Sequence, residues 1–149
     1  MVKENKLTAF GAKVEDLELA QRDRLLDMDA LFSSKRYSGA LAAGIYALEI
    51  LLKVHVCRTL RLDSLPKAFE IHDLDGLLIL TGYHNLLNGE RMRKSSVKRN
   101  WEEIRNVSSK LNDLRYQPDD MTTENQAKTF YYQLRDEKDG VIPWLLNPA

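Results

Sequence analysis

Residues 36–60 read RYSGALAAGIYALEILLKVHVCRTL, a stretch without proline. It is apolar on nearly every side from Ala40 to Leu52, as expected of a helix that other helices surround. At 1.5 Å per residue, about 23 helical residues reach about 35 Å. Small residues recur along it at Ala40, Ala43, Gly44 and Ala47. Such a stripe lets another helix approach closely, so this stretch predicts a long central helix.

Apolar positions recur at helical spacing on both sides of this stretch. The pattern predicts further helices over residues 17–33, 72–82, 92–104 and 123–138, and a short last turn within 141–149. Thr123 and Gln126 have the spacing of a capping box, which favours a helix beginning there. We find neither strand-like alternation nor a repeat of fixed period. The expected fold is therefore all-α, a single-domain up-and-down bundle of about five helices.

Two segments do not fit this pattern of helices. Residues 106–121 contain Asn106, Asn112, Pro118, Asp119 and Asp120, which favour an ordered connection over a helix. Residues 1–16 are polar around a small apolar island, and they predict a flexible arm that docks through Phe10. The helical domain is accordingly expected over residues 17–149.

Composition narrows the class of protein without revealing its function. The 149 residues include 22 basic and 22 acidic ones, so the formal charge is 22 − 22 = 0 and only local patches can attract a polyanion. The lone cysteine, Cys57, cannot form an internal disulfide, which favours a reducing compartment. The first residues, MVKENKLTAF, lack the long apolar stretch of a signal peptide, and we expect no apolar run as long as a membrane span. We expect a cytoplasmic protein that contacts no membrane.

The chain lacks the sequence motifs of phosphate-binding loops, metal sites and cysteine nucleophiles. The scattered glycines form neither GxxxxGK[ST] nor GxGxxG, so a phosphate-binding loop is excluded. His55, His72 and His84 are 17 and 12 residues apart, and neither an HExxH motif nor a cysteine pair accompanies them, as a metal site would need. Cys57 lies near the end of an apolar helix, where packing is a better explanation than nucleophilic catalysis. We expect no metal and no cofactor.

Two short-range pairs are candidates for binding, each with a structural explanation that we favour. Glu49 is a carboxylate in an apolar helix, and Lys53 follows one turn later in the favourable order for an ion pair at the rim of the buried face. Asp73 can cap the helix that begins there, and His72 can hydrogen-bond nearby backbone. A binding role for either pair is the alternative.

The segment RMRKSSVKR holds the one strong basic run of the chain. Its basic residues are Arg91, Arg93, Lys94, Lys98 and Arg99, with no acidic residue among them. The run could hold phosphate groups of a nucleotide or nucleic acid, although a solvated helix face is the commoner explanation. Arg115 and Tyr116 could add a bidentate phosphate contact and a stacking ring, or Arg115 could hold a loop carboxylate.

Taken in order, these motifs resemble the HEPN domain, a helical family found with nucleotidyltransferases and in toxin–antitoxin systems. The resemblance covers residues 17 to about 140 and rests on RYSGALAAGIYALEILLK, IHDLDGLLILTG, NWEEIRNVSSKLNDLRY and an aromatic final helix. The matching positions are Tyr37, Ala40, Glu49, Leu52 and Lys53 in the second helix, His72, Asp73 and Leu74 at the third, and Arg115 with Tyr116. Each match is weak alone, and their order along one short chain is more specific.

The resemblance implies a helical, usually dimeric module that binds nucleotide or RNA and partners a minimal nucleotidyltransferase. Some branches cut RNA through an arginine followed, after four to six residues, by a histidine. None of the three histidines here has an arginine at that spacing, so we expect a non-catalytic member. The small-residue stripe motivates a homodimer. We expect Glu49, His72 and Arg115 to approach a shared groove.

Two alternatives remain open. One is a ribonuclease with a non-standard site, using His72, Arg115 and Tyr116 across a dimer cleft. The other is a structural helical adaptor that binds neither nucleotide nor RNA.

Overall fold

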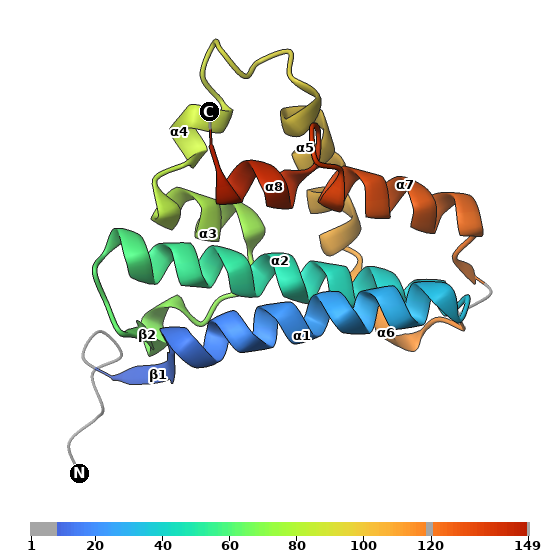
Figure 1. Cartoon of the computed structure of the whole chain (residues 1–149), viewed down its shortest axis with the longest axis horizontal. Helices are drawn as coiled ribbons and strands as arrows, with labels where there is room; N and C mark the ends of the chain where they lie inside the picture. Colours follow the sequence, from blue (N-terminus) through green and yellow to red (C-terminus); the bar gives the residue numbers. More distant parts are fainter. Residues whose placement is uncertain (1–8, 119–120, 149) are drawn as a thin grey trace.

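The structure is a computed structural model that describes residues 9–118 and 121–148, with the backbone alone at Arg115. Helices and one short ribbon of strands make up these residues (Figure 1). The helices are α1 (Val14–Ser33), α2 (Tyr37–Thr59), α3 (Leu74–Thr81), α4 (His84–Leu87), α5 (Ser96–Ser108), α6 (Leu111–Tyr116), α7 (Glu124–Arg135) and α8 (Val141–Leu146). The strands are β1 (Phe10–Lys13) and β2 (Ser64–Pro66), and β2 leads into a 3-10 turn at Lys67–Phe69. The predicted fold class, a mostly α-helical bundle, is confirmed.

Helix α2 is the centre of the bundle, as its apolar sequence predicts. Helices α1, α3, α5, α6 and α7 all contact it, and in Figure 1 α1 runs alongside it in the opposite direction. Leu48, Leu52 and Val56 are completely buried on it. Contrary to the expectation that no apolar run is as long as a membrane span, α2 could cross a membrane by length and hydropathy, but most of it is buried by the other helices. Such burial is typical of the core helix of a soluble protein.

The small-residue stripe on α2 serves packing within the chain. A Cβ atom at Gly44 would lie 2.7 Å from Cε1 of Phe130 and 3.0 Å from Sδ of Met28. Gly44 therefore admits side chains from both α7 and α1 at a distance that alanine would not allow. Ala40 and Ala47 are completely buried beside it. Because this surface is covered by the chain's own helices, it gives no support to the predicted homodimer.

The expectation that the chain has no strand is wrong. Strands β1 and β2 pair antiparallel, with Phe10 opposite Pro66 and Lys13 opposite Ser64. Strands of three and four residues are too short to show an alternating pattern, and backbone hydrogen bonds rather than side chains join them. The predicted arm thus includes a paired strand, and α1 begins inside it at Val14. Phe10 is exposed, so it does not dock the arm; residues 1–8 lie outside the described part of the chain.

The expectation of a non-helical connection over residues 106–121 is also wrong. Helix α5 continues to Ser108, and α6 follows at Leu111–Tyr116. Asn106 and Asn112 are exposed on these helices, where a polar side chain does not interrupt the backbone. Leu111 and Leu114 pack against the core and hold α6 in place. Pro118 lies beyond the end of α6, and residues 119–120 are outside the described segments.

The predicted helix ends mostly agree with the structure. Asp73 is the N-cap of α3, and Gly82, with a φ of 85°, ends it in the left-handed conformation. Thr123 and Gln126 form the predicted capping box of α7. The fourth predicted helix begins later than expected, because Ser95 caps α5 through its side chain.

His55 is a buried imidazole near the end of α2. Its ring lies edge-on to Tyr83, 5.7 Å between centroids, and its Nε2 has no hydrogen-bond partner among the described residues. Burial, helped by the positive charge of Arg58, lowers the pKa of His55 below its ordinary value of 6.5. The folded protein therefore holds His55 neutral at a pH where the unfolded chain is partly protonated.

This predicts a specific loss of stability in mild acid. Between the lowered pKa and about 6.5 the unfolded chain binds more protons, so the free energy of unfolding falls as pH decreases, by at most about 1.4 kcal/mol per pH unit for one group. Urea unfolding at pH 7.5 and 5.5 measures this fall. The H55F variant should show a smaller fall than the wild type, because it removes the titrating imidazole. Equal falls in H55F and the wild type would contradict the assignment.

Candidate functional site

The structure brings Glu49 and His72 together. Glu49 is buried on α2, and the Nδ1–H of His72 donates a hydrogen bond to its Oε1 at 2.6 Å. Nζ of Lys53 lies 3.8 Å from the same oxygen, which confirms the predicted pair. One hydrogen bond and one nearby ammonium thus stabilise a carboxylate that would otherwise be unfavourable in this apolar setting. The cluster fastens the segment before α3 to α2, with Glu49 buried and the side chain of His72 82% exposed.

The residues that follow His72 are structural. Oδ1 of Asp73 accepts a hydrogen bond from the backbone N–H of Asp75 at 3.2 Å, which confirms the capping interpretation. Asp75 in turn accepts hydrogen bonds from Nε1 of Trp101 at 3.0 Å and from Nη1 of Arg105 at 3.1 Å. The first turn of α3 is therefore tied to α5, which carries the basic residues.

Four of the five predicted basic residues converge at the start of α5. They surround an open hollow of about 340 Å³, here called the basic pocket, which is lined by Arg93, Lys94, Ser95, Lys98, Arg99 and Glu102. Ser95 caps α5 by accepting a hydrogen bond from the backbone N–H of Lys98 at 3.1 Å. In the described part of the chain, Arg93, Lys94 and Lys98 form no ion pair. Arg91 is exposed in the preceding turn and does not line the pocket.

Arg115 and Tyr116 lie on α6, away from the Glu49 cluster along α2. Leu114 of α6 shares a cavity with Leu41, which precedes Glu49 by 49 − 41 = 8 residues, or about 12 Å of helix. Tyr116 is 86% exposed, and the side chain of Arg115 lies outside what the structure describes. The structure thus joins Glu49 to His72 and leaves the predicted groove with Arg115 untested.

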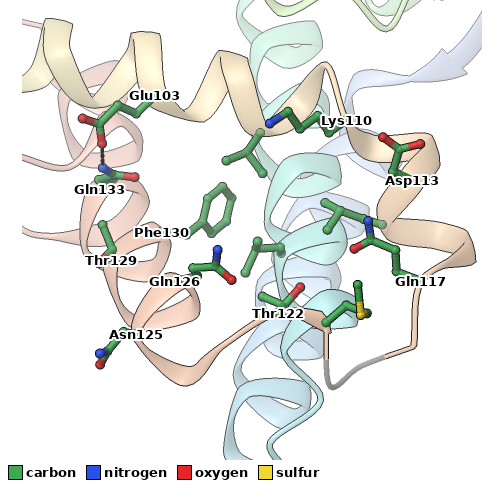
Figure 2. A pocket seen from close by; sticks show the side chains of 14 residues that line it. Glu103, Lys110, Asp113, Gln117, Thr122, Asn125, Gln126, Thr129, Phe130 and Gln133 are labelled. Carbon is green, nitrogen blue, oxygen red and sulfur yellow. Dashed lines mark hydrogen bonds between the residues drawn. The ribbon is translucent and has the colours of Figure 1, made fainter.

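A larger cavity, which the sequence did not predict, lies where α5, α6 and α7 meet above the start of α2 (Figure 2). It measures about 560 Å³ and is here called the α5–α7 cavity. Its apolar lining consists of Leu41, Val107, Leu114, Met121 and Phe130. Its polar lining consists of Glu103, Lys110, Asp113, Gln117, Thr122, Asn125, Gln126, Thr129 and Gln133. This mixture of an apolar floor and several polar groups is typical of sites that bind small ligands.

Buried polar contacts define two walls of the α5–α7 cavity. Gln133 is buried on α7 and donates a hydrogen bond to Glu103 of α5, joining these helices at one side of the hollow (Figure 2). The hydroxyls of Thr122 and Ser38 are hydrogen-bonded at 2.7 Å and fasten the segment before α7 to α2. The cavity is therefore bounded by residues that the fold holds in place.

One signal in the sequence could have revealed this cavity. Val107, Leu111 and Leu114 are spaced by four and then three residues, the period of a helix face. Weighing this spacing above the turn-forming asparagines would have predicted α6, and with it a third wall beside α5 and α7. The polar residues on the rim carry no motif that identifies them.

Comparison with known proteins adds no relative. No family model, no curated protein and no solved structure matches this chain.

Proposed function

We propose that the protein is a cytoplasmic, non-catalytic module that binds nucleotide or RNA through phosphate contacts in the basic pocket. One observation carries the proposal: Arg93, Lys94, Lys98 and Arg99 surround one open hollow at the start of a 13-residue helix. Lysine and arginine side chains of this kind neutralise phosphates. The N-terminal end of α5 adds partial positive charge to the same place.

The arrangement favours backbone phosphates over bases as the groups bound in the pocket. Its cationic side chains are long and mostly exposed, and Ser95 is engaged in the helix cap. Since the whole chain has no net charge, the attraction is confined to this face. Binding is therefore expected to be salt-sensitive and largely independent of base sequence at the pocket itself.

The proposal of a binding module rather than a nuclease has one support, which is the absence of a sequence motif. No histidine follows an arginine at the spacing that cuts RNA in the HEPN domains that this chain resembles. The same resemblance underlies our proposals of a homodimer and of a minimal nucleotidyltransferase as partner in a toxin–antitoxin-type system.

Charge reversal at the pocket tests phosphate binding. We expect K98E/R99E to bind a dye-labelled 12-nucleotide RNA at least about tenfold more weakly than the wild type at low salt, because two phosphate contacts are lost. The slope of log affinity against log salt should become less negative by about 1.4, or 0.7 per contact on a single strand. Fluorescence anisotropy over a salt series measures both quantities.

The control variant K67E/K138E makes the same change in net charge at exposed lysines outside the basic pocket. It should retain most of the wild-type affinity. Equal losses in the two variants would show that long-range charge alone is responsible, and an absence of RNA binding by the wild type would reject the proposal.

The alternatives give different results in the same preparation. Cleavage of mixed RNAs that is lost in H72A would favour a ribonuclease. A structural adaptor would show no rise in melting temperature with either ATP or RNA, whereas a ligand at 100 times its Kd stabilises by about 2.7 kcal/mol. Analytical ultracentrifugation tests the homodimer, and co-purification with a nucleotidyltransferase encoded beside this chain tests the partner.

A further inference from the structure

We propose that the α5–α7 cavity binds a purine base of the nucleotide or RNA whose phosphates lie in the basic pocket. This inference rests on the proposed function and adds a second site, one that selects a class of base. The two sites share helix α5. Glu102 lines the basic pocket, and the next residue, Glu103, lines the cavity.

The dimensions of α5 suit one ligand reaching both sites. From Lys98 to Val107 the helix rises through nine residues, about 14 Å. A stacked strand advances by about 3.4 Å per nucleotide, so this distance corresponds to about four nucleotides. A single strand lying along the exposed side of α5 could therefore place a base in the cavity while other nucleotides keep their phosphates at the basic pocket.

The floor of the cavity suits a flat ring. Leu41 and Phe130 are both buried, and Figure 2 shows the ring of Phe130 pointing into the hollow. At about 560 Å³ the cavity lies within the range of 300–1,000 Å³ typical of small-ligand pockets. Single-stranded RNA is commonly recognised by splaying out a base and placing it against an aromatic side chain. An unstacked base placed there would bury its own apolar faces against this floor.

The polar groups of the cavity suit the edge of a purine. Carboxylates at Glu103 and Asp113 can accept hydrogen bonds from amino groups, as acidic side chains do from exocyclic amines of bases. Lys110 and the carboxamide of Gln117 can donate to ring nitrogens or to a carbonyl oxygen. Adenine and guanine present an amino group together with the acceptor N7. Uracil has no amino group, so it could not donate to Asp113, and Glu103 would keep only its hydrogen bond from Gln133.

The test compares two homopolymers that differ only in the base. The probes are dye-labelled 12-nucleotide oligo(A) and oligo(U), with adenosine and uridine as ligands that lack phosphates. T129F introduces a ring at the exposed rim of the cavity, and N112F adds the same ring on α6 at a residue outside its lining. Circular dichroism and melting temperatures establish that both variants fold. D113A, matched with N112A, replaces this pair if T129F does not fold.

We expect the wild type to bind oligo(A) about tenfold more tightly than oligo(U), within the discrimination that one well-paired base provides. T129F should bring the ratio to about one, leaving oligo(U) affinity and its salt dependence unchanged, and N112F should retain the tenfold ratio. A wild-type ratio of one, or a ratio that persists in T129F, would overturn the purine site while leaving the phosphate site in place.

The nucleosides separate this inference from the proposed function. Adenosine should raise the melting temperature of the wild type and not that of T129F, and uridine should have no effect on either. If adenosine behaves so while neither RNA binds, the cavity assignment is supported and the proposed function fails. If K98E/R99E weakens RNA binding but adenosine has no effect at saturating concentration, the purine site fails alone.

Discussion

The W101A variant should lower the free energy of unfolding by about 3–5 kcal/mol, the range typical of truncating a buried tryptophan. Trp101 is 3% exposed within the main apolar core, so truncation leaves a cavity that the surrounding helices cannot fully close. It also removes the hydrogen bond from its Nε1 to Asp75, which ties α5 to α3. Since a whole domain is stable by only about 5–15 kcal/mol, the loss is a large fraction of the total.

Urea unfolding followed by circular dichroism measures this effect. W101F is the matched control, because it keeps most of the ring volume and loses the indole hydrogen bond. Its expected loss is smaller than that of W101A, with about 0.5–1.5 kcal/mol of it from the hydrogen bond. A loss below 1 kcal/mol in W101A would mean that Trp101 does not anchor α5.

The second large effect concerns the buried charges of α2. E49L should lower the free energy of unfolding by about 3–5 kcal/mol, because it leaves the ammonium of Lys53 largely buried without its carboxylate. It also removes the acceptor of the His72 hydrogen bond. Replacing both members of a buried pair by apolar residues is often close to neutral. The double variant E49L/K53M should therefore be more stable than E49L.

A double-mutant cycle, with the free energy of unfolding measured in urea, tests whether Glu49 and Lys53 are energetically coupled. K53M alone should be milder than E49L, because Glu49 retains its hydrogen bond from His72. If the losses of unfolding free energy in E49L and K53M simply add in E49L/K53M, the two charges are not coupled. The ion pair would then contribute nothing to stability.

Most of the fold could be predicted from the sequence, because the spacing of apolar residues indicates which side of each helix is buried. The apolar run of α2 predicts its central place, and the capping chemistry of Asp73, Gly82 and Thr123 predicts helix ends. The ribbon of β1 and β2 could not be predicted, because its stability comes from backbone pairing between segments about fifty residues apart. Helix α6 was missed because exposed asparagines resemble turn residues when their neighbours are unknown.

The candidate sites were predictable to different degrees. The basic pocket follows from a single run of cations, since residues 93–99 hold all four and lie on either side of the N-cap of α5. The contact between Glu49 and His72 is only partly local, because the intervening segment must fold back along α2. The α5–α7 cavity depends on the angles at which three helices meet. No short-range pattern in the chain specifies those angles.

The close fit at Gly44 has a consequence for the cavity. The ring of Phe130 lies against the gap that Gly44 leaves in α2, and Leu134 of α7 also lies beside it. A slide of α7 by one residue would drive these side chains into α2, so the register of the two helices is locked. The cavity wall that α7 provides is thus preorganised. A ligand that binds there would lose little affinity to the entropic cost of ordering α7.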